Sequence, residues 1–178
     1  AVMGSKNLKA VVVRGTIEPT FANPDDMKKL SKRVNLEVGD DVKKGSSLRE
    51  YGTAYVPPIT NELGILPTNN FQKGVFENVE NISGHALKEK YLLRAKPCYR
   101  CPIACGRETE LDEPDYKGSG EGPEYETIAA LGSACGVDNL AAVTKANYYC
   151  NELGLDTISA GMTIAGAMEL SEKGIIPI

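Results

Sequence analysis

The chain has 178 residues, a net charge of -4 at pH 7, and 42% hydrophobic and 25% charged residues. This is ordinary globular composition for one domain or one and a half, and the absence of a dominant basic block excludes nucleic-acid or membrane-surface binding as the main function. No apolar run approaches the roughly 20 residues that span a bilayer, and no signal-peptide pattern is evident, so we expect a cytoplasmic protein.

The first 16 residues contain one strand-like segment. Residues Leu8 to Arg14 are rich in β-branched side chains and end at Gly15, which is typical of a short buried strand. We expect this strand to belong to a sheet that the chain lacks. Because the sequence begins without a methionine and stops shortly after a helical pattern, we expect a piece of a longer protein.

The rest of the sequence predicts a mainly α fold. Asn23 is suited to cap a helix whose first turn holds Pro24. Residues 39–84 are rich in Gly, Pro, Asn and Ser, so we predict mostly loop there, with one short helix near Ser47 to Tyr51. Further helices are predicted from capping residues and glycine stops. They cover residues 83 to about 94, 124–134, 140–153 and 157–173.

Three cysteines form the most informative motif. Cys98, Cys101 and Cys105 follow the order C-x2-C-x3-C, and thiolates at this spacing can bind one iron-sulfur cluster, which normally needs four ligands. Zinc is the main alternative, although the single histidine, His85, lies in a predicted helix. A third interpretation is three buried structural thiols. Cys135 and Cys150 lie on apolar helical faces and are predicted to be structural.

Basic residues surround the cysteine motif. A solvated basic face is one interpretation, and a docking surface for an acidic electron carrier such as ferredoxin is the other. The residues concerned are Lys88, Lys90, Arg94, Lys96, Arg100 and Arg107.

Four segments together resemble the aldehyde:ferredoxin oxidoreductase family, in the family's order and over nearly the whole chain. They are residues 1–10, residues 66–71 (LPTNNF), the cysteine motif with its PIA insert, and residues 122–127 (GPEYET) with residues 151–157 downstream.

The resemblance implies an oxidoreductase that oxidises a small aldehyde to a carboxylic acid and passes the electrons through a 4Fe-4S cluster to ferredoxin. Its metal is tungsten, or molybdenum in its place, held between two pterins. Residues 1–16 then end the sheet-rich first domain, and residues 17–178 belong to the helical second domain. The family's third domain supplies the fourth cysteine and a second pterin motif, so we expect the chain alone to be inactive and its cofactor sites to be incomplete.

The resemblance also implies site residues. The family's pterin motif, D-x-x-G-L-D, corresponds to Asn151, Gly154, Leu155 and Asp156, with Asn151 in place of the usual aspartate. Gly154 is expected to end a helix with positive φ and let the backbone approach the pterin, while Asp156 accepts hydrogen bonds from the ring or caps the next helix.

A glutamate of the GPEYET segment is implied as the catalytic base. Glu126 matches best and Glu124 is its alternative; a plain helix-start glutamate is the non-catalytic interpretation. Two other functions stay open. One is a related tungsten enzyme that reduces an aromatic-ring thioester, and the other is a non-catalytic iron-sulfur or zinc structural module.

Overall fold

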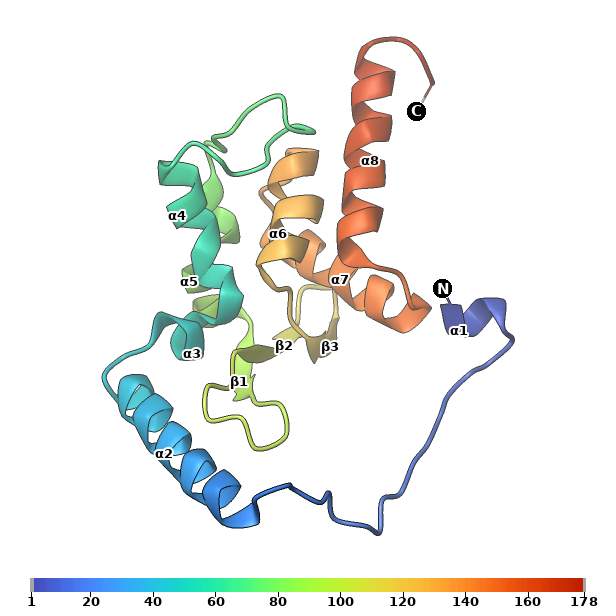
Figure 1. The fold of residues 1–178 in the computed structure, drawn as a ribbon. Coiled ribbons are helices and arrows are strands. Elements are labelled where there is room, and N and C mark those ends of the chain that lie inside the picture. The colour runs from blue at the N-terminus through green and yellow to red at the C-terminus, as the bar shows by residue number, and fades with distance from the viewer. Residues whose placement is uncertain (1, 178) are drawn as a thin grey trace.

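The computed structural model describes residues 2–177 and has a mainly α fold, as predicted, together with one small sheet that the sequence did not predict (Figure 1). Three 3-10 turns, η1 (Gly52–Tyr55), η2 (Val79–Ile82) and η3 (Ser133–Cys135), join the helices. Within residues 2–177, no helix is both long and apolar enough to cross a membrane. The α-helices are α1 (Val2–Ser5), α2 (Pro24–Lys43), α3 (Ser47–Tyr51), α4 (Val56–Glu62), α5 (Gly84–Lys90), α6 (Tyr125–Leu131), α7 (Leu140–Leu153) and α8 (Thr157–Glu172).

The strand predicted at residues 8–14 is not formed. The chain from α1 to α2 is exposed and arcs away from the rest of the molecule (Figure 1). Val12, for example, is 92% exposed. A strand needs a neighbour for its N–H and C=O groups, and none of the described strands pairs with this segment. The proposed domain boundary after residue 16 therefore stays a prediction.

Local signals placed α2 and α3 correctly, but α4 was missed. Asn23 caps α2 by accepting a hydrogen bond from the Asp26 N–H at 3.3 Å. In α4, Pro57 stands in the first turn, where its missing N–H has no partner to lose. The prediction of mostly loop for residues 39–84 is therefore wrong here, because Pro57 and Pro58 stand in the first turn of a helix, where proline is tolerated.

A three-stranded antiparallel sheet replaces the end of the predicted helix at residues 83–94. Helix α5 ends at Lys90, and β1 (Leu92–Lys96), β2 (Gly106–Leu111) and β3 (Gly118–Glu121) follow in the order β1-β2-β3. Lys96 pairs with Gly106 across the first two strands. Residues 97–105, which we call the cysteine loop, therefore form the connection of a β-hairpin.

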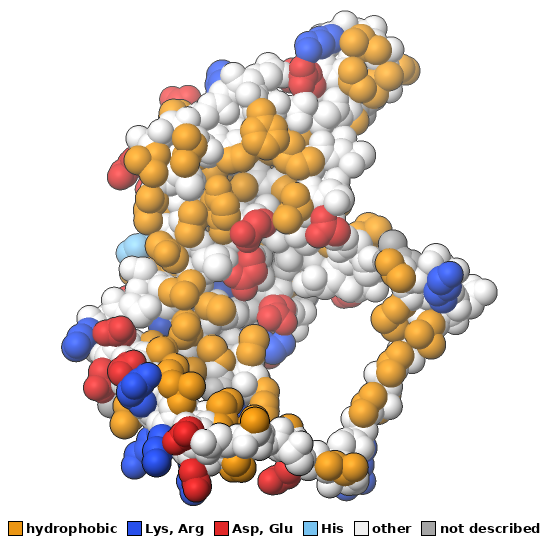
Figure 2. Space-filling model, in the orientation of Figure 1, with side chains coloured by type: hydrophobic (Ala, Val, Ile, Leu, Met, Phe, Trp, Pro, Cys, Tyr) orange, Lys and Arg blue, Asp and Glu red, His pale blue; other side chains and the backbone are white. Residues whose placement is uncertain are grey.

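The core lies between the short helices and the sheet. Its largest cluster joins η2, α5, α6 and α7 through side chains such as Ile82, Leu87, Ile128 and Val143. Cys135 and Cys150 are both buried, as predicted, and burial raises the pKa of each thiol. Figure 2 shows further apolar side chains gathered on the face over α4 and α6. Exposed apolar areas of this kind are typical of surfaces that contact other protein.

Close contact between α6 and α8 gives a first testable prediction. A Cβ added at Gly161 would lie 2.5 Å from the Ala130 carbonyl carbon, so Gly161→Ala must push the two helices apart. We expect it to reduce the free energy of unfolding by about 1–3 kcal/mol. Gly166→Ala in the same helix is the matched control, because its Cβ would meet nothing within 4 Å. The control should stabilise by up to about 1 kcal/mol through helix propensity. Chemical denaturation of both variants measures the difference, and equal effects would contradict the packing argument.

Candidate functional site

The cysteine loop carries its three thiols in a constrained backbone. Cys98 is exposed, while Cys101 and Cys105 are half-buried. The Cys101 N–H donates to the Cys98 carbonyl at 3.0 Å, which closes a turn between them. The residues just before the second and third cysteines, Arg100 and Ala104, have φ of +57° and +56°. Non-glycine residues adopt this left-handed region only where the surroundings enforce it, and such sites cluster at functional positions.

The donor set of this loop fits an iron-sulfur cluster in its chemistry. Thiolates are the usual ligands of such clusters, and all three thiols are free and lie on one loop. Across residues 2–177, however, no three His, Cys, Asp or Glu side chains are grouped closely enough to hold a metal ion. The structure thus brings the three cysteines into one loop without bringing their sulfurs to one point.

The predicted basic patch is smaller than the sequence indicated. Three of its members are engaged in ion pairs, Lys88 with Glu50 at 2.6 Å, Lys96 with Glu121 at 3.0 Å and Arg94 with Glu108. Arg107 is buried and belongs to no surface patch, which corrects the prediction. Its burial is possible because its guanidinium donates to main-chain carbonyls in place of water.

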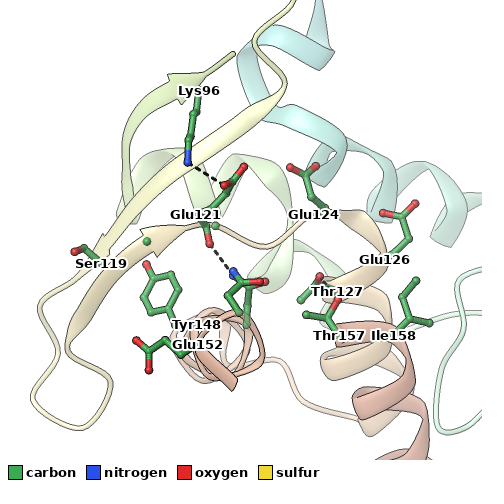
Figure 3. A pocket seen from close by; sticks show the side chains of 14 residues that line it. Lys96, Ser119, Glu121, Glu124, Glu126, Thr127, Tyr148, Glu152, Thr157 and Ile158 are labelled. Atoms are coloured by element: carbon green, nitrogen blue, oxygen red, sulfur yellow. Dashed lines mark hydrogen bonds and ion pairs between the residues drawn. The ribbon is translucent and has the colours of Figure 1, made fainter. Parts of the chain in front are cut away.

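A cavity of about 750 Å³ opens beside the sheet (Figure 3). Its walls come from the end of β1, from β3 and the Gly122–Glu124 connection, and from α6, α7 and α8. This volume is in the range of sites that bind organic ligands and cofactors. Glu126 and Asn151, which the sequence assigned to catalysis and to cofactor binding, both line this cavity.

Carboxylates dominate one wall of the cavity. Figure 3 shows Glu121, Glu124 and Glu126 along the same side. Glu121 pairs with Lys96, while Glu124 accepts a hydrogen bond from the Thr53 hydroxyl. That hydroxyl in turn accepts from the Tyr125 N–H at 2.8 Å, which fixes the start of α6. Carboxylates in this arrangement can accept N–H donors of a bound ring or take up a proton.

Glu126 and Glu124 differ in how firmly they are held. Glu126 is exposed in the first turn of α6, whereas Glu124 is half-buried at the residue before the helix and tied to Thr53. Glu126 also borders a smaller apolar cavity of about 170 Å³ with Phe71 and Met162. It therefore stands where a polar and an apolar space meet.

The predicted pterin motif lies at the junction of α7 and α8. Gly154 ends α7 with φ +68°, as predicted, and a Cβ there would meet nothing within 4 Å. Asp156 caps α8 by accepting from the Ser159 N–H at 2.7 Å, and hydrogen bonding from Ser159 lowers the pKa of its carboxyl group. Gly154, Leu155 and Asp156 do not line the large cavity, but Thr157 and Ile158 directly after them do. Of the four motif residues, Asn151 lines the cavity and the other three lie beside it, with the Asp156 carboxylate as a hydrogen-bond acceptor at the start of α8.

Sequence reasoning missed several residues of this site. Thr53, which bonds to Glu124, comes from η1, more than 70 positions earlier in the sequence. Lys96 of β1 pairs with Glu121 of β3 because β2 holds both strands in one sheet. No local pattern marks such partners. The polar segment Gly118–Glu121 follows an acidic turn and carries no strand signal, so its place in the cavity wall was not predictable.

Comparison with known proteins gives one consistent family. The family model described as aldehyde ferredoxin oxidoreductase, domains 2 and 3, matches residues 29–178. The tungsten-containing aldehyde ferredoxin oxidoreductase of Pyrococcus furiosus is 49% identical over 176 residues, and that of Thermococcus kodakarensis is 47% identical. Each alignment covers 99% of this chain and 29% of the relative. The aliphatic sulfonate oxidoreductase, WOR-like subunit, of P. furiosus is 31% identical over 179 residues, 99% of this chain and 28% of the relative.

Proposed function

This chain belongs to the aldehyde ferredoxin oxidoreductase family, and on that premise we propose that the whole protein is a cytoplasmic enzyme that oxidises an aldehyde to a carboxylic acid. The chain spans less than a third of the length of the curated relatives it matches. The reaction R-CHO + H2O → R-COOH + 2 H+ + 2 electrons needs an electron acceptor, which we propose is ferredoxin. The higher identity to aldehyde oxidising relatives than to the sulfonate oxidoreductase supports the aldehyde.

One observation carries the proposal for the site. Glu126 and Asn151 are far apart in the sequence and come from α6 and α7, yet they line a single carboxylate-rich cavity. We propose that this cavity holds one side of a tungsten-bispterin cofactor, or its molybdenum counterpart. When bound, that cofactor accepts the two electrons of the oxidation. Asn151, Gly154, Leu155 and Asp156 would hold the pterin by accepting its N–H groups and letting it approach the backbone.

We propose Glu126 as the catalytic base and the cysteine loop as the route out for electrons. Glu126 would take one of the two protons that the aldehyde and water release, at the border of the polar and apolar cavities, and the second would pass to solvent. Cys98, Cys101 and Cys105 would supply three ligands to a 4Fe-4S cluster, and the remainder of the protein would supply the fourth.

Metal analysis of the full-length protein, produced without oxygen and with tungstate, tests the proposal. We expect one tungsten and one 4Fe-4S cluster per polypeptide, together with aldehyde-dependent reduction of ferredoxin. Zinc in place of iron, without activity, would favour a structural module instead. Activity on an aromatic-ring thioester without aldehyde oxidation would favour the related tungsten enzyme.

Electron transfer gives a second prediction. If ferredoxin docks at the cysteine loop, replacing Arg94 and Arg100 by alanine should lower the association rate by roughly two- to tenfold at low salt and weaken its salt dependence. Stopped-flow reduction of ferredoxin measures both. The matched control is the double variant Lys32→Ala with Arg33→Ala on α2, which removes the same two positive charges. Each double variant also breaks one ion pair, Arg94 with Glu108 in the first and Arg33 with Glu37 in the control. An equal effect of the two double variants would argue against docking at the loop.

A further inference from the structure

Arg107 is the largest of the fully buried side chains, with 2% of its surface exposed. Its guanidinium donates to the carbonyls of Glu50 and Gly106 at 2.9 Å each, to that of Cys105 at 3.2 Å, and to that of Ala104. Three of these acceptors are consecutive residues, the last two of the cysteine loop and the first of β2, and the fourth belongs to α3. The forked donors of arginine suit such a set, whereas a lysine ammonium would not span it.

A second arginine holds the preceding part of the loop. Arg49 of α3 donates from Nη1 to the carbonyls of Pro102 and Ile103 at 3.2 and 3.4 Å. Arg49 and Arg107 together therefore engage every carbonyl from residue 102 to residue 106. The main chain on both sides of Cys105 is therefore tied to α3, directly by Arg49 and, through the carbonyl of Glu50, by Arg107 of β2.

The contact with the short helices is close enough to require a glycine. Gly52, at the start of η1, has φ +65°, and a Cβ there would lie 2.6 Å from the Cys105 carbonyl oxygen and 3.2 Å from Arg107 Nε. No larger residue fits without moving the loop or the guanidinium. The close packing of η1 against the cysteine loop therefore depends on a glycine at position 52.

Arg107 also places a buried charge next to one of the proposed ligands. Its Nε lies 3.2 Å from the Cys105 carbonyl oxygen, and its side chain is 2% exposed. An arginine keeps its proton in proteins, so this charge is permanent. A charge in a low-dielectric interior acts far more strongly on its neighbours than an exposed one.

We propose that Arg107, assisted by Arg49, is a positioning residue that fixes the cysteine loop for metal binding and whose buried charge raises the reduction potential of the cluster. This inference rests on the proposed function, because the cluster is part of it. The physical reason is that a cluster gains negative charge on reduction, and a fixed nearby cation stabilises that form.

The test uses the full-length holoenzyme with three variants. Arg107→Gln removes the charge and part of the donor set, Arg107→Lys keeps the charge without the fork, and Arg94→Gln removes an exposed charge from the same hairpin. Iron retained during a chelator challenge reports how firmly the loop holds the cluster. A redox titration followed by electron paramagnetic resonance reports its midpoint potential, which a merely structural role would leave unchanged.

We expect Arg107→Gln to lose iron about 10- to 100-fold faster than the wild type, and its cluster to have a more negative potential. Arg107→Lys should lose iron faster but keep a potential near that of the wild type. Arg94→Gln should match the wild type in iron retention. Its shift in midpoint potential should be smaller than that of Arg107→Gln, because solvent screens the charge of Arg94.

Wild-type behaviour of both Arg107 variants would overturn the inference and leave the proposed function standing. A wild-type protein without any iron-sulfur cluster would overturn both. Should Arg107→Gln fail to fold, Arg49→Gln carries the test, because Arg49 is exposed and its removal leaves the core intact. If Arg49→Gln then lost iron no faster than Arg94→Gln, the proposed positioning of the cysteine loop by the two arginines would be contradicted.

Discussion

In the full-length enzyme, Glu126→Gln is expected to lower kcat by about 100- to 10,000-fold with tungsten content unchanged. Glutamine keeps the shape and the hydrogen-bonding capacity of the side chain but cannot take up a proton at neutral pH. Because Glu126 is exposed at the start of α6, the substitution removes no buried contact. The fall should therefore appear in kcat without loss of stability. Steady-state oxidation of an aldehyde with a viologen acceptor measures it, and metal analysis checks the tungsten.

Glu124→Gln is the matched control, two positions away on the same cavity wall. Its amide oxygen can still accept the hydrogen bond from Thr53, so the start of α6 should be preserved. We expect a much smaller effect on kcat than in Glu126→Gln. If kcat fell strongly in Glu124→Gln but not in Glu126→Gln, Glu124 rather than Glu126 would be the catalytic base. The hydrogen bond from Thr53, which holds Glu124 in place on the cavity wall, makes that the specific alternative.

Local signals predicted α7 and α8 well because the ends of these helices depend on neighbouring residues. Helix α7 runs from Leu140 to Leu153 as predicted, with an Asn139 cap and Gly154 in the left-handed region at its end. Asp156 likewise caps α8. These features need only the residues within one helical turn, so a single sequence contains them.

The sheet could not be predicted in the same way, because its pairing is not local. Strand β2 is largely polar and β3 consists of two glycines, a serine and a glutamate, so neither has the alternation of a half-buried strand. Their stability comes from cross-strand pairing and from Tyr148 of α7, whose hydroxyl bonds to Thr109 of β2. Long-range contacts of this kind leave no mark on neighbouring residues.

The dependence on long-range contacts also explains which site residues the sequence placed correctly and which it did not. Family resemblance, which the comparisons confirm, brought Glu126 and Asn151 into one proposed site, and they line one cavity. Arg107 was counted as a surface charge because arginines are mostly exposed. Only the folded chain reveals four carbonyls in place to receive its donors.

The cysteine motif yields the other prediction with a large effect. In the full-length enzyme, Cys105→Ser should remove the 4Fe-4S signal and most of the bound iron, because a serine oxygen is a poor substitute for a thiolate on iron. Electron transfer to ferredoxin should then fall to background. Iron analysis, electron paramagnetic resonance and ferredoxin reduction measure the three consequences. Cys105 is chosen because the two arginines fix the main chain around it, so the substitution changes the ligand and not the loop.

Cys150→Ser is the control that separates a ligand from a structural thiol. Cys150 is buried in α7, where burial raises the pKa of its thiol, and a buried thiol of raised pKa is a poor metal ligand. We expect this variant to keep its iron and its ferredoxin activity, with at most a loss of stability from placing a hydroxyl in an apolar site. If both variants kept their iron, the cluster would need another ligand set. If Cys105→Ser lost zinc rather than iron, the loop would be a zinc site, and the electrons would have to leave the cavity by a different route.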